Sequence, residues 1–372
     1  MTDLRSLLQR HVDDGAYPGA VGLIAHGDRI EVAAVGRQSV GGPPMTEDSI
    51  FRLASITKPV TAAAVLMLVD EGRLRLDDPV ARWIPSLADP MVVRTPSSPV
   101  DDVVPANRPI TVFDLLSSQA GYGFASDFTL PSIQALATVQ TDGRIPSTFP
   151  PADEWTARLS RLPLAYQPGE AWLYDTCSTL QGVLVERVTE GALPDFLAAR
   201  LFGPLGMADA GFFVPPAKRA RLTSYYRPGP ELVDRPDGEF AAPPVFALGN
   251  GGLCGTASDW LAFGQMLLAG GAGLLTPDSV RRMTADHTTA AQRATGELFL
   301  DGQGWGFGGS VDIARTNPWN VPGRYGWVGG TGTSAHIDPS AGTVAVLLTQ
   351  MGEDSPVAPR WMRDFWRYAA AG

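Results

Sequence analysis

Ser55 and Lys58, three residues apart, are the pair in this chain best suited to do chemistry. The chain of 372 residues contains only two lysines against 27 arginines, and one of the two lysines lies here. Residues i and i+3 share one face of a helix, so the Lys58 amine can reach the Ser55 hydroxyl. A buried lysine can give up its proton whereas an arginine cannot, and a serine hydroxyl needs such a base before it attacks a carbonyl. The spacing therefore predicts a nucleophile and its base.

The element that must position this pair is a helix from Ser55 to Glu71, which Gly72 ends. Its apolar residues at helical spacing are Val60, Ala63, Ala64, Met67 and Leu68. They predict a buried helix that holds the pair rigidly. Burial and the positive end of the helix dipole disfavour an ammonium ion, so we expect the pKa of Lys58 to fall towards neutrality. On the pair alone, the alternative is a serine that caps the helix and a partly exposed lysine.

Segments with strand patterns lie near the two ends of the chain. Residues 20–26 and 29–35 flank a Gly-Asp turn, and residues 333–338 and 343–349 flank a second turn. Turn residues between such segments are typical of β-hairpins. Because the two hairpins lie so far apart in sequence, we predict that both termini contribute to one antiparallel sheet.

The middle of the chain alternates between helical patterns and long polar, proline-rich loops at residues 89–109, 141–151 and 215–244. Loops of that length usually line or cover a site. We therefore predict an α/β (α+β) fold, in which an antiparallel sheet from both termini is flanked by helices and joined to a mostly helical lobe. The predicted boundaries are a discontinuous sheet domain of residues 1–75 and 255–372 and a mostly helical domain of residues 76–254, with the active site between them.

Composition excludes several classes of partner. Hydrophobic residues make up 44% of the chain and charged residues 18%, which is typical of a globular protein. The formal net charge of −10 argues against binding to nucleic acid or to an anionic membrane.

The N-terminal residues 1–12 form an amphipathic helical pattern without the apolar middle of a secretory signal. We therefore expect a cytoplasmic protein, unless a leader has been removed.

Cysteines and histidines give no sign of a metal site. Cys177 and Cys254 are far apart and lack metal-ligand spacing, so we expect both to be reduced and buried. The histidines are expected to be structural or exposed, and they are His11, His26, His287 and His336. We expect no metal and no organic cofactor.

No Gly-x-Ser-x-Gly elbow occurs in the sequence, which argues against the serine hydrolases that carry one.

The segment around Ser55 resembles the serine β-lactamase and penicillin-binding-protein superfamily. It is most similar to the class C β-lactamase-like serine hydrolases, which include the family VIII carboxylesterases. Residues 167–176 resemble the second motif of that family and imply that Tyr174 is the third catalytic group. Residues 326–334 resemble the third motif, which implies an oxyanion hole made by the N–H groups of Ser55 and Gly330. Further similar segments are residues 118–122, 201–207, 251–257 and 304–308.

Two departures from the family motifs bear on the substrate. The asparagine expected two residues after the tyrosine is Thr176, with Asp175 between, and the cationic first residue of the third motif is Trp327. Both changes favour an uncharged ester over an anionic lactam or peptide, and aromatic residues suit an apolar acyl or aryl group. The resemblance thus implies a set of substrate-binding residues, which are Trp327, Gly329, Tyr122, Thr176 and Asp175.

Together these patterns predict a serine hydrolase of β-lactamase/transpeptidase-like fold that cleaves small carboxylic esters through an acyl-enzyme on Ser55. An acyltransferase that uses the same acyl-enzyme is one alternative, and a weak β-lactamase or D-alanyl peptidase is another. A binding protein on an inactive hydrolase fold is the third. The expected partner is a small ester or acyl substrate, and the sequence sets no oligomeric state.

Overall fold

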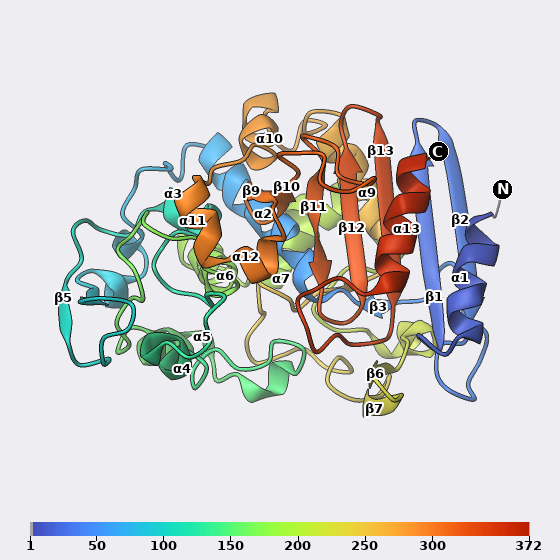
Figure 1. Cartoon of the computed structure of the whole chain (residues 1–372), viewed down its shortest axis with the longest axis horizontal. Coiled ribbons are helices and arrows are strands. Elements are labelled where there is room, and N and C mark those ends of the chain that lie inside the picture. Colours follow the sequence, from blue (N-terminus) through green and yellow to red (C-terminus); the bar gives the residue numbers. More distant parts are fainter. Residues whose placement is uncertain (1–2, 372) are drawn as a thin grey trace.

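The computed structural model describes residues 3–371, and its central feature is a seven-stranded antiparallel sheet (Figure 1). Its strands are β1 (Gly19–His26), β2 (Arg29–Gly36), β9 (Gly304–Trp305), β10 (Ser310–Val311), β11 (Tyr325–Gly329), β12 (Thr333–Asp338) and β13 (Thr343–Thr349). They lie in the order β2-β1-β13-β12-β11-β10-β9. β1 pairs with β13, with Ala20 opposite Thr349, so both ends of the chain build one sheet. Both predicted hairpins and the shared sheet are confirmed.

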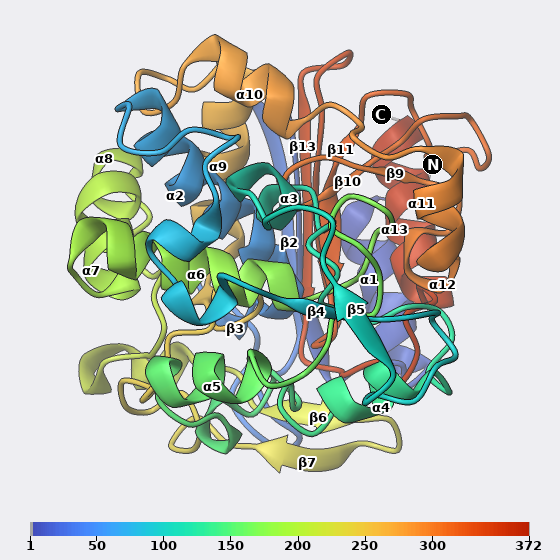
Figure 2. The same cartoon turned by 90° about the vertical axis from the view of Figure 1, so that its left-hand side faces the viewer.

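Helices cover both faces of the sheet. α1 (Leu4–Asp13) and α13 (Arg360–Ala371) pack on one face, and α9 (Ala257–Leu268) packs on the other. Figure 2 shows the strands nearly edge-on, with α9 on one side and α1 and α13 on the other. Alternate side chains of a strand point to opposite faces. In β13, Val346 accordingly joins the core beneath α9, whereas Leu347 joins the smaller cluster beneath α1 and α13.

The chain between β3 and β9 is mostly helical. Its α-helices are α2 (Lys58–Asp70), α3 (Val112–Leu116), α4 (Pro131–Leu136), α5 (Ala152–Leu159), α6 (Thr176–Thr189), α7 (Leu193–Leu197), α8 (Gly203–Leu205), α9, α10 (Pro277–Met283), α11 (Ala290–Thr295) and α12 (Glu297–Leu300). Other helical turns are η1 (Ala54–Thr57), η2 (Val80–Arg82), η3 (Pro85–Leu87), η4 (Pro146–Thr148), η5 (Ala198–Phe202) and η6 (Pro216–Arg221). Short strands pair as β3 (Phe51–Arg52) with β8 (Cys254–Gly255), β4 (Met91–Val93) with β5 (Val103–Pro105), and β6 (Tyr225–Arg227) with β7 (Glu231–Asp234).

The helix predicted from Ser55 is divided in two. Residues 54–57 form the 3₁₀ turn η1, and the α-helix α2 begins at Lys58. Pro59 explains the division, because it has no N–H to donate to the Ser55 carbonyl as an α-helix would require. The Lys58 N–H bonds to that carbonyl instead. α2 is buried through Leu68, as predicted, and Gly72 follows its end with a φ of +70°.

One hydrophobic core joins the sheet to the helical part. It includes Leu23 and Val346 of the sheet, and it continues through α2 to Leu115 of α3 and Leu184 of α6. α2 packs directly against α6. The division into domains at residues 75 and 254 therefore stays a prediction.

Cys177 and Cys254 are free and buried, as predicted. No helix within residues 3–371 is long and apolar enough to cross a bilayer.

The contact between α9 and the sheet yields a stability prediction. A Cβ added at Gly264 of α9 would lie 2.8 Å from Val344 Cγ1 and 3.2 Å from Ile337 Cγ2. We expect Gly264→Leu to lower the free energy of unfolding by about 1–3 kcal/mol, because side chains forced into a packed core strain their neighbours. Urea denaturation measures the change. The control is Gln265→Leu at the exposed neighbouring position, which should stay within about 0.5 kcal/mol. Equal losses in both variants would contradict this packing.

Candidate active site

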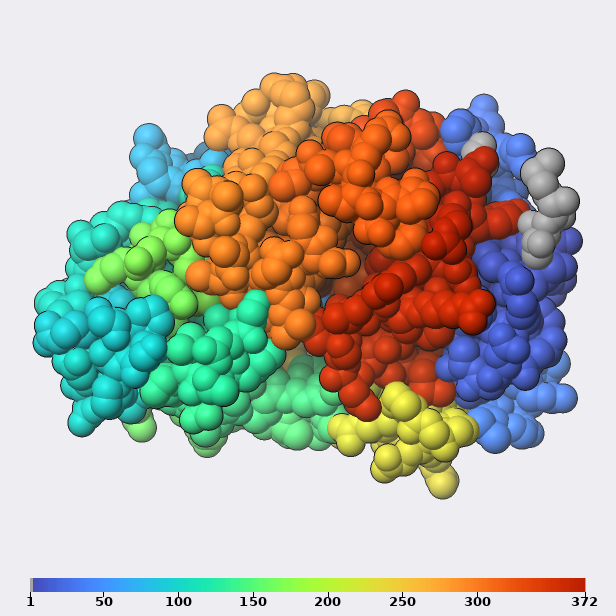
Figure 3. Space-filling model, viewed as in Figure 1, coloured from blue at the N-terminus to red at the C-terminus, as the bar shows by residue number. Residues whose placement is uncertain are grey.

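A cavity of about 540 Å³ lies where the sheet meets the helical part, and Ser55 is one of the residues that line it. Its walls come from distant parts of the chain: the 3₁₀ turn at Ser55, the end of β11, residues 140–144, and residues 353–359. Figure 3 shows the green, orange and red segments meeting on one face of the molecule. Such a concave site is the usual place for a small-molecule substrate.

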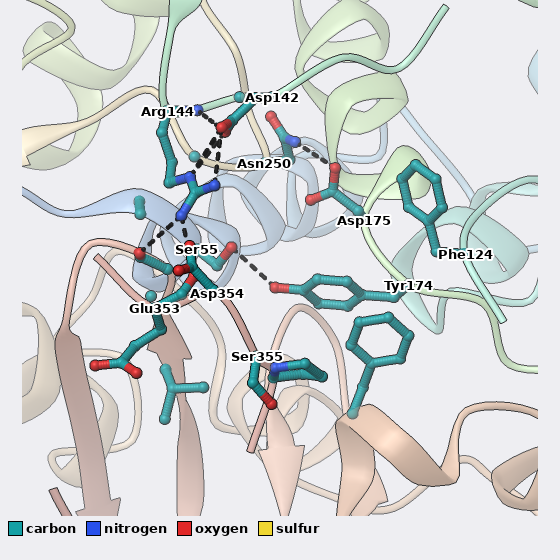
Figure 4. A pocket seen from close by; sticks show the side chains of 18 of the residues that line it. Ser55, Phe124, Asp142, Arg144, Tyr174, Asp175, Asn250, Glu353, Asp354 and Ser355 are labelled. Carbon is teal, nitrogen blue, oxygen red and sulfur yellow. Dashed lines mark hydrogen bonds and ion pairs between the residues drawn. The ribbon is translucent and has the colours of Figure 1, made fainter. Parts of the chain in front are cut away.

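Ser55 Oγ lies between the side chains of Lys58 and Tyr174. Lys58 Nζ is 2.8 Å from Ser55 Oγ. Tyr174 Oη is 2.9 Å from the same oxygen (Figure 4). Lys58 is fully buried, whereas Ser55 and Tyr174 reach the cavity. The structure thus brings together the three residues that the motifs singled out, and a serine oxygen within hydrogen-bond reach of two proton-carrying groups is a candidate nucleophile.

Lys58 has two close partners that the sequence analysis did not predict. Its Nζ donates to the backbone oxygen of Asn250 at 2.8 Å and forms an ion pair with Asp175 Oδ1 at 2.8 Å. Burial is the largest influence on the pKa of Lys58 and lowers it, but the charge and hydrogen bonds of Asp175 and Tyr174 outweigh burial. The pKa of Lys58 is therefore raised above its ordinary value. The prediction of a lysine pKa near neutrality was wrong, because the carboxylate beside the amine was not taken into account.

Tyr174 is fixed by aromatic neighbours and by one hydrogen bond. Its ring stacks on Phe299 with centroids 4.7 Å apart, and Trp327 Nε1 donates to Tyr174 Oη at 2.9 Å. Its backbone pairs with that of Phe124 through two hydrogen bonds of 2.9 Å. The indole N–H thus donates to the same oxygen that contacts Ser55 Oγ. Trp327 thus occupies the first place of the third motif without supplying a cation.

The strand end beside Ser55 is clamped by two hydroxyl groups. Thr331 Oγ1 donates to the Arg52 carbonyl at 2.6 Å, and Thr333 Oγ1 donates to the Leu53 carbonyl at 2.8 Å. Ser55 lies in the first turn of η1, where a backbone N–H has no acceptor within the helix. Gly330, just beyond β11, lines the same cavity. This arrangement suits two N–H donors for a substrate oxygen, although the oxyanion hole stays a proposal.

One wall of the cavity is apolar. Phe124, Phe128 and Phe299 form a row of aromatic rings with neighbouring centroids 6.2 and 6.1 Å apart, and Phe128 is about half exposed at 48%. Further apolar lining residues are Trp327, Val328, Pro356, Val357, Pro359 and Met362. This wall suits an apolar acyl or aryl group.

The opposite wall is polar and mostly acidic. Arg144 binds Asp142 through Nε and Nη2, and its Nη1 donates to the Glu353 carbonyl at 3.1 Å. Burial and the nearby charge of Asp354 raise the pKa of Glu353 to about 7. Sequence reasoning did not single out these residues. The only signal was the loop at 141–151, whose length suggested that it lines a site.

The predicted substrate-binding residues divide into two groups. Trp327, Gly329 and Asp175 line the cavity. Tyr122 and Thr176 lie elsewhere: the Tyr122 hydroxyl is buried and donates to the Leu162 carbonyl at 3.1 Å, and Thr176 is fully buried at the start of α6. For these two residues the structure contradicts the assignment, because an adjacent place in a motif does not decide which way a side chain points.

The described residues hold no cluster of three or more His, Cys, Asp or Glu side chains that is arranged to bind a metal ion. The histidines also lie away from the catalytic candidates. His336 is buried on β12, where burial and Arg324 hold its pKa well below the ordinary value. His287 stacks on Phe307 with ring centroids 4.4 Å apart. The side chains within hydrogen-bond reach of Ser55 Oγ are those of Lys58 and Tyr174.

Comparison with known proteins covers almost the whole chain. A family model described as Beta-lactamase matches residues 4–365. Protein Rv1367c of Mycobacterium tuberculosis is 36% identical over 93% of this chain and 88% of its own. Esterase EstB of Burkholderia gladioli is 31% identical over 92% of this chain and 88% of its own. Among solved structures, EstCE1, described as a hydrolase with promiscuous acyltransferase activity, has a TM-score of 0.81 at 24% identity and covers 98% of this chain and 97% of its own.

Two adjacent glycines at the strand end allow a matched test of the close approach to Ser55. A Cβ at Gly329 would lie 2.5 Å from the Leu53 carbonyl oxygen, whereas at Gly330 the nearest atom would be Arg144 Cδ at 3.5 Å. We expect Gly329→Ala to lower the free energy of unfolding by about 1–3 kcal/mol. Gly330→Ala should change it by less than about 0.5 kcal/mol. Chemical denaturation of both variants measures the free energy of unfolding. An unchanged free energy in Gly329→Ala would mean that the end of β11 lies farther from the Leu53 carbonyl than the structure shows.

Proposed function

The chain belongs to the beta-lactamase family, and from this membership and the surroundings of Ser55 we propose that it is a serine hydrolase that cleaves small carboxylic esters. The observation that carries the proposal is the position of Ser55 Oγ, which lies 2.8 Å from Lys58 Nζ and 2.9 Å from Tyr174 Oη inside a cavity. EstB, a relative 31% identical, is named an esterase, which supports the same activity here.

In the proposed reaction, Ser55 Oγ forms a bond to the ester carbonyl carbon while its proton passes to the oxygen of Tyr174. The ion pair with Asp175 favours Lys58 as an ammonium, which cannot accept that proton. We therefore assign the role of base to Tyr174 rather than to Lys58. In this role the Tyr174 oxygen accepts a hydrogen bond from the Trp327 N–H at 2.9 Å, and Lys58 Nζ lies 4.6 Å from the centroid of the Tyr174 ring.

Two further steps complete the cycle. The N–H groups of Ser55 and Gly330 are the proposed donors to the negative oxygen of the tetrahedral intermediate. As the carbon–oxygen bond to the alcohol breaks, Tyr174 returns its proton to the departing alkoxide, which leaves the acyl group on Ser55. Water, activated by the same oxygen, then releases the acid. Acyl transfer differs only in that an alcohol or amine takes the place of water.

The charges around the cavity favour an ester over an anionic lactam. Four carboxylates line the cavity or its rim, and they are Asp142, Asp175, Glu353 and Asp354. The cation on the polar wall, Arg144, is already paired with Asp142. The Trp327 indole N–H is engaged by Tyr174 and carries no charge to bind a carboxylate. A neutral ester with an apolar acyl or aryl group meets no such repulsion.

A panel of p-nitrophenyl esters, with a chromogenic cephalosporin and an anilide, tests this function. We expect ester hydrolysis by the wild type, labelling of Ser55 by a fluorophosphonate, and a loss of kcat/KM of roughly 10³-fold or more in Ser55→Ala. The control is Ser340→Ala on the exposed turn after β12, which should keep full activity. Added butanol separates acyl transfer from hydrolysis. Undiminished turnover in Ser55→Ala, or cephalosporin hydrolysis at the ester rate, would disprove the proposal.

A second variant tests the hydrogen bond to Tyr174. Trp327→Phe removes the N–H donor but retains most of the ring, so we expect kcat to fall about 10-fold with little change in KM, as for loss of a bond to a charged oxygen. The matched control is Trp305→Phe. Trp305 packs edge-on against Trp327, and its own N–H has no partner among the described residues. Its kcat should change less than about 2-fold. Equal effects on kcat in the two variants would contradict a catalytic role for the hydrogen bond from Trp327 Nε1 to Tyr174 Oη.

A further inference from the structure

Asp175 has a backbone conformation that few residues other than glycine adopt. Its φ is +84° and its ψ is −62°, and the Thr176 N–H donates to the Tyr174 carbonyl at 3.2 Å, which closes a three-residue γ-turn. Strained conformations of this kind persist only where the surrounding structure holds them. Here the turn lies between the backbone pairing of Tyr174 with Phe124 and the start of α6. The strain therefore lies next to a proposed catalytic residue.

The carboxylate of Asp175 is engaged on both oxygens. Oδ1 is 2.8 Å from Lys58 Nζ, and Oδ2 accepts from Gln140 Nε2 and Asn250 Nδ2, each at 2.8 Å. Gln140 and Asn250 are both buried. Figure 4 shows the Asn250 amide pointing at Asp175 beside the cavity. Two buried amides from separate segments thus hold the carboxylate against the lysine.

The surroundings of Lys58 match an ammonium ion. An ammonium has three N–H donors and no acceptor, whereas a neutral amine has two donors and a lone pair. Nζ has three acceptors at 2.8 Å: Ser55 Oγ, the Asn250 carbonyl oxygen and Asp175 Oδ1. A neutral amine could accept the Ser55 O–H at its lone pair, but it would leave the carboxylate of Asp175 without a cation at 2.8 Å. Nζ also lies 4.6 Å from the centroid of the Tyr174 ring, an arrangement that favours a cation.

We propose that Asp175 is a positioning residue: its carboxylate, fixed by Gln140 and Asn250, keeps Lys58 protonated and directed at Ser55, so that Lys58 donates a hydrogen bond throughout the reaction. This rests on the proposed hydrolase function and assigns Asp175 a role other than substrate binding. Among the other charged groups around the cavity, Arg144 pairs with Asp142, and the charge of Asp354 raises the pKa of Glu353. Asp175 is thus the carboxylate that faces Nζ directly.

Asp175→Asn removes the charge while retaining the shape of the side chain. Asparagine adopts positive φ more readily than most residues, so the turn can persist. Gln140 Oε1 and Asn250 Oδ1 are buried and have no hydrogen-bond partner within residues 3–371, so either amide can turn over and accept from the new N–H₂ group. We expect the variant to fold with an unchanged circular dichroism spectrum. The charge of Asp175 is the largest influence that opposes burial, and without it Tyr174 alone opposes burial, so the pKa of Lys58 should fall.

The two lysines of the chain allow this pKa to be measured without any assay of activity. With lysine labelled by ¹³C at Cε, NMR should show two signals, from Lys58 and Lys218. The Lys218→Arg variant shows which signal belongs to which lysine. Lys218, which lies on η6 and pairs with Asp209, serves as the internal reference. In Asp175→Asn the Lys58 signal should titrate at least about 1 pH unit lower than in the wild type, with Lys218 unmoved. Asp142→Asn, which removes a cavity carboxylate that pairs with Arg144, should leave the Lys58 signal in place.

Activity provides the second measurement. If the working enzyme needs Lys58 as an ammonium, activity is lost as pH rises through the pKa of Lys58. A lower pKa therefore moves the alkaline limb of kcat/KM in Asp175→Asn to lower pH, by as much as the Lys58 NMR signal moves, while KM below that limb changes little. An unmoved Lys58 signal overturns the role of Asp175, whatever the enzyme hydrolyses. A shifted signal in a protein without esterase activity supports the role of Asp175 and instead refutes the proposed function.

Discussion

The burial of one lysine ammonium is the constraint on which the site depends. A buried charge without partners costs several kcal/mol, so the protein must supply acceptors from its own chain. For Lys58 these acceptors come from three places: Ser55 on η1, Asp175 ahead of α6, and the carbonyl of Asn250 in a loop. The three segments are far apart in sequence. A single cation thus helps to fix how the sheet side and the helical side of the cavity meet.

The same site depends on a close approach of the strand end to η1. Gly329 leaves room for the Leu53 carbonyl, and the hydroxyls of Thr331 and Thr333 bind the carbonyls just ahead of Ser55. These contacts set the distance between the serine and the N–H groups that would stabilise a developing negative charge. Since donors of this kind act by being already in place, a rigid clamp matters more than any one hydrogen bond. The apolar wall of Phe124, Phe128 and Phe299 lies in the same cavity and suits an apolar acyl or aryl group.

Much of the fold could be predicted because its signals are local. The strand-like segments of β1, β2, β12 and β13 and the turns between them are visible in the sequence, and the prediction of one shared sheet followed from them. The strands β9 and β10 contain two residues each, which is too short for any periodicity to show. The division between η1 and α2 was missed, although Pro59 carries the reason, because the apolar pattern continues across it.

The sequence by itself determined the pair Ser55 and Lys58, because spacing along a helix decides which side chains can share a face. Its resemblance to known family motifs pointed to Tyr174 and to the glycines at the end of β11. Only the tertiary structure decided the charge state of Lys58, the place of Asp175 and the exclusion of Tyr122 and Thr176 from the cavity. A pKa depends on every charge and dipole within a few ångströms, and here those groups come from segments that only folding brings together.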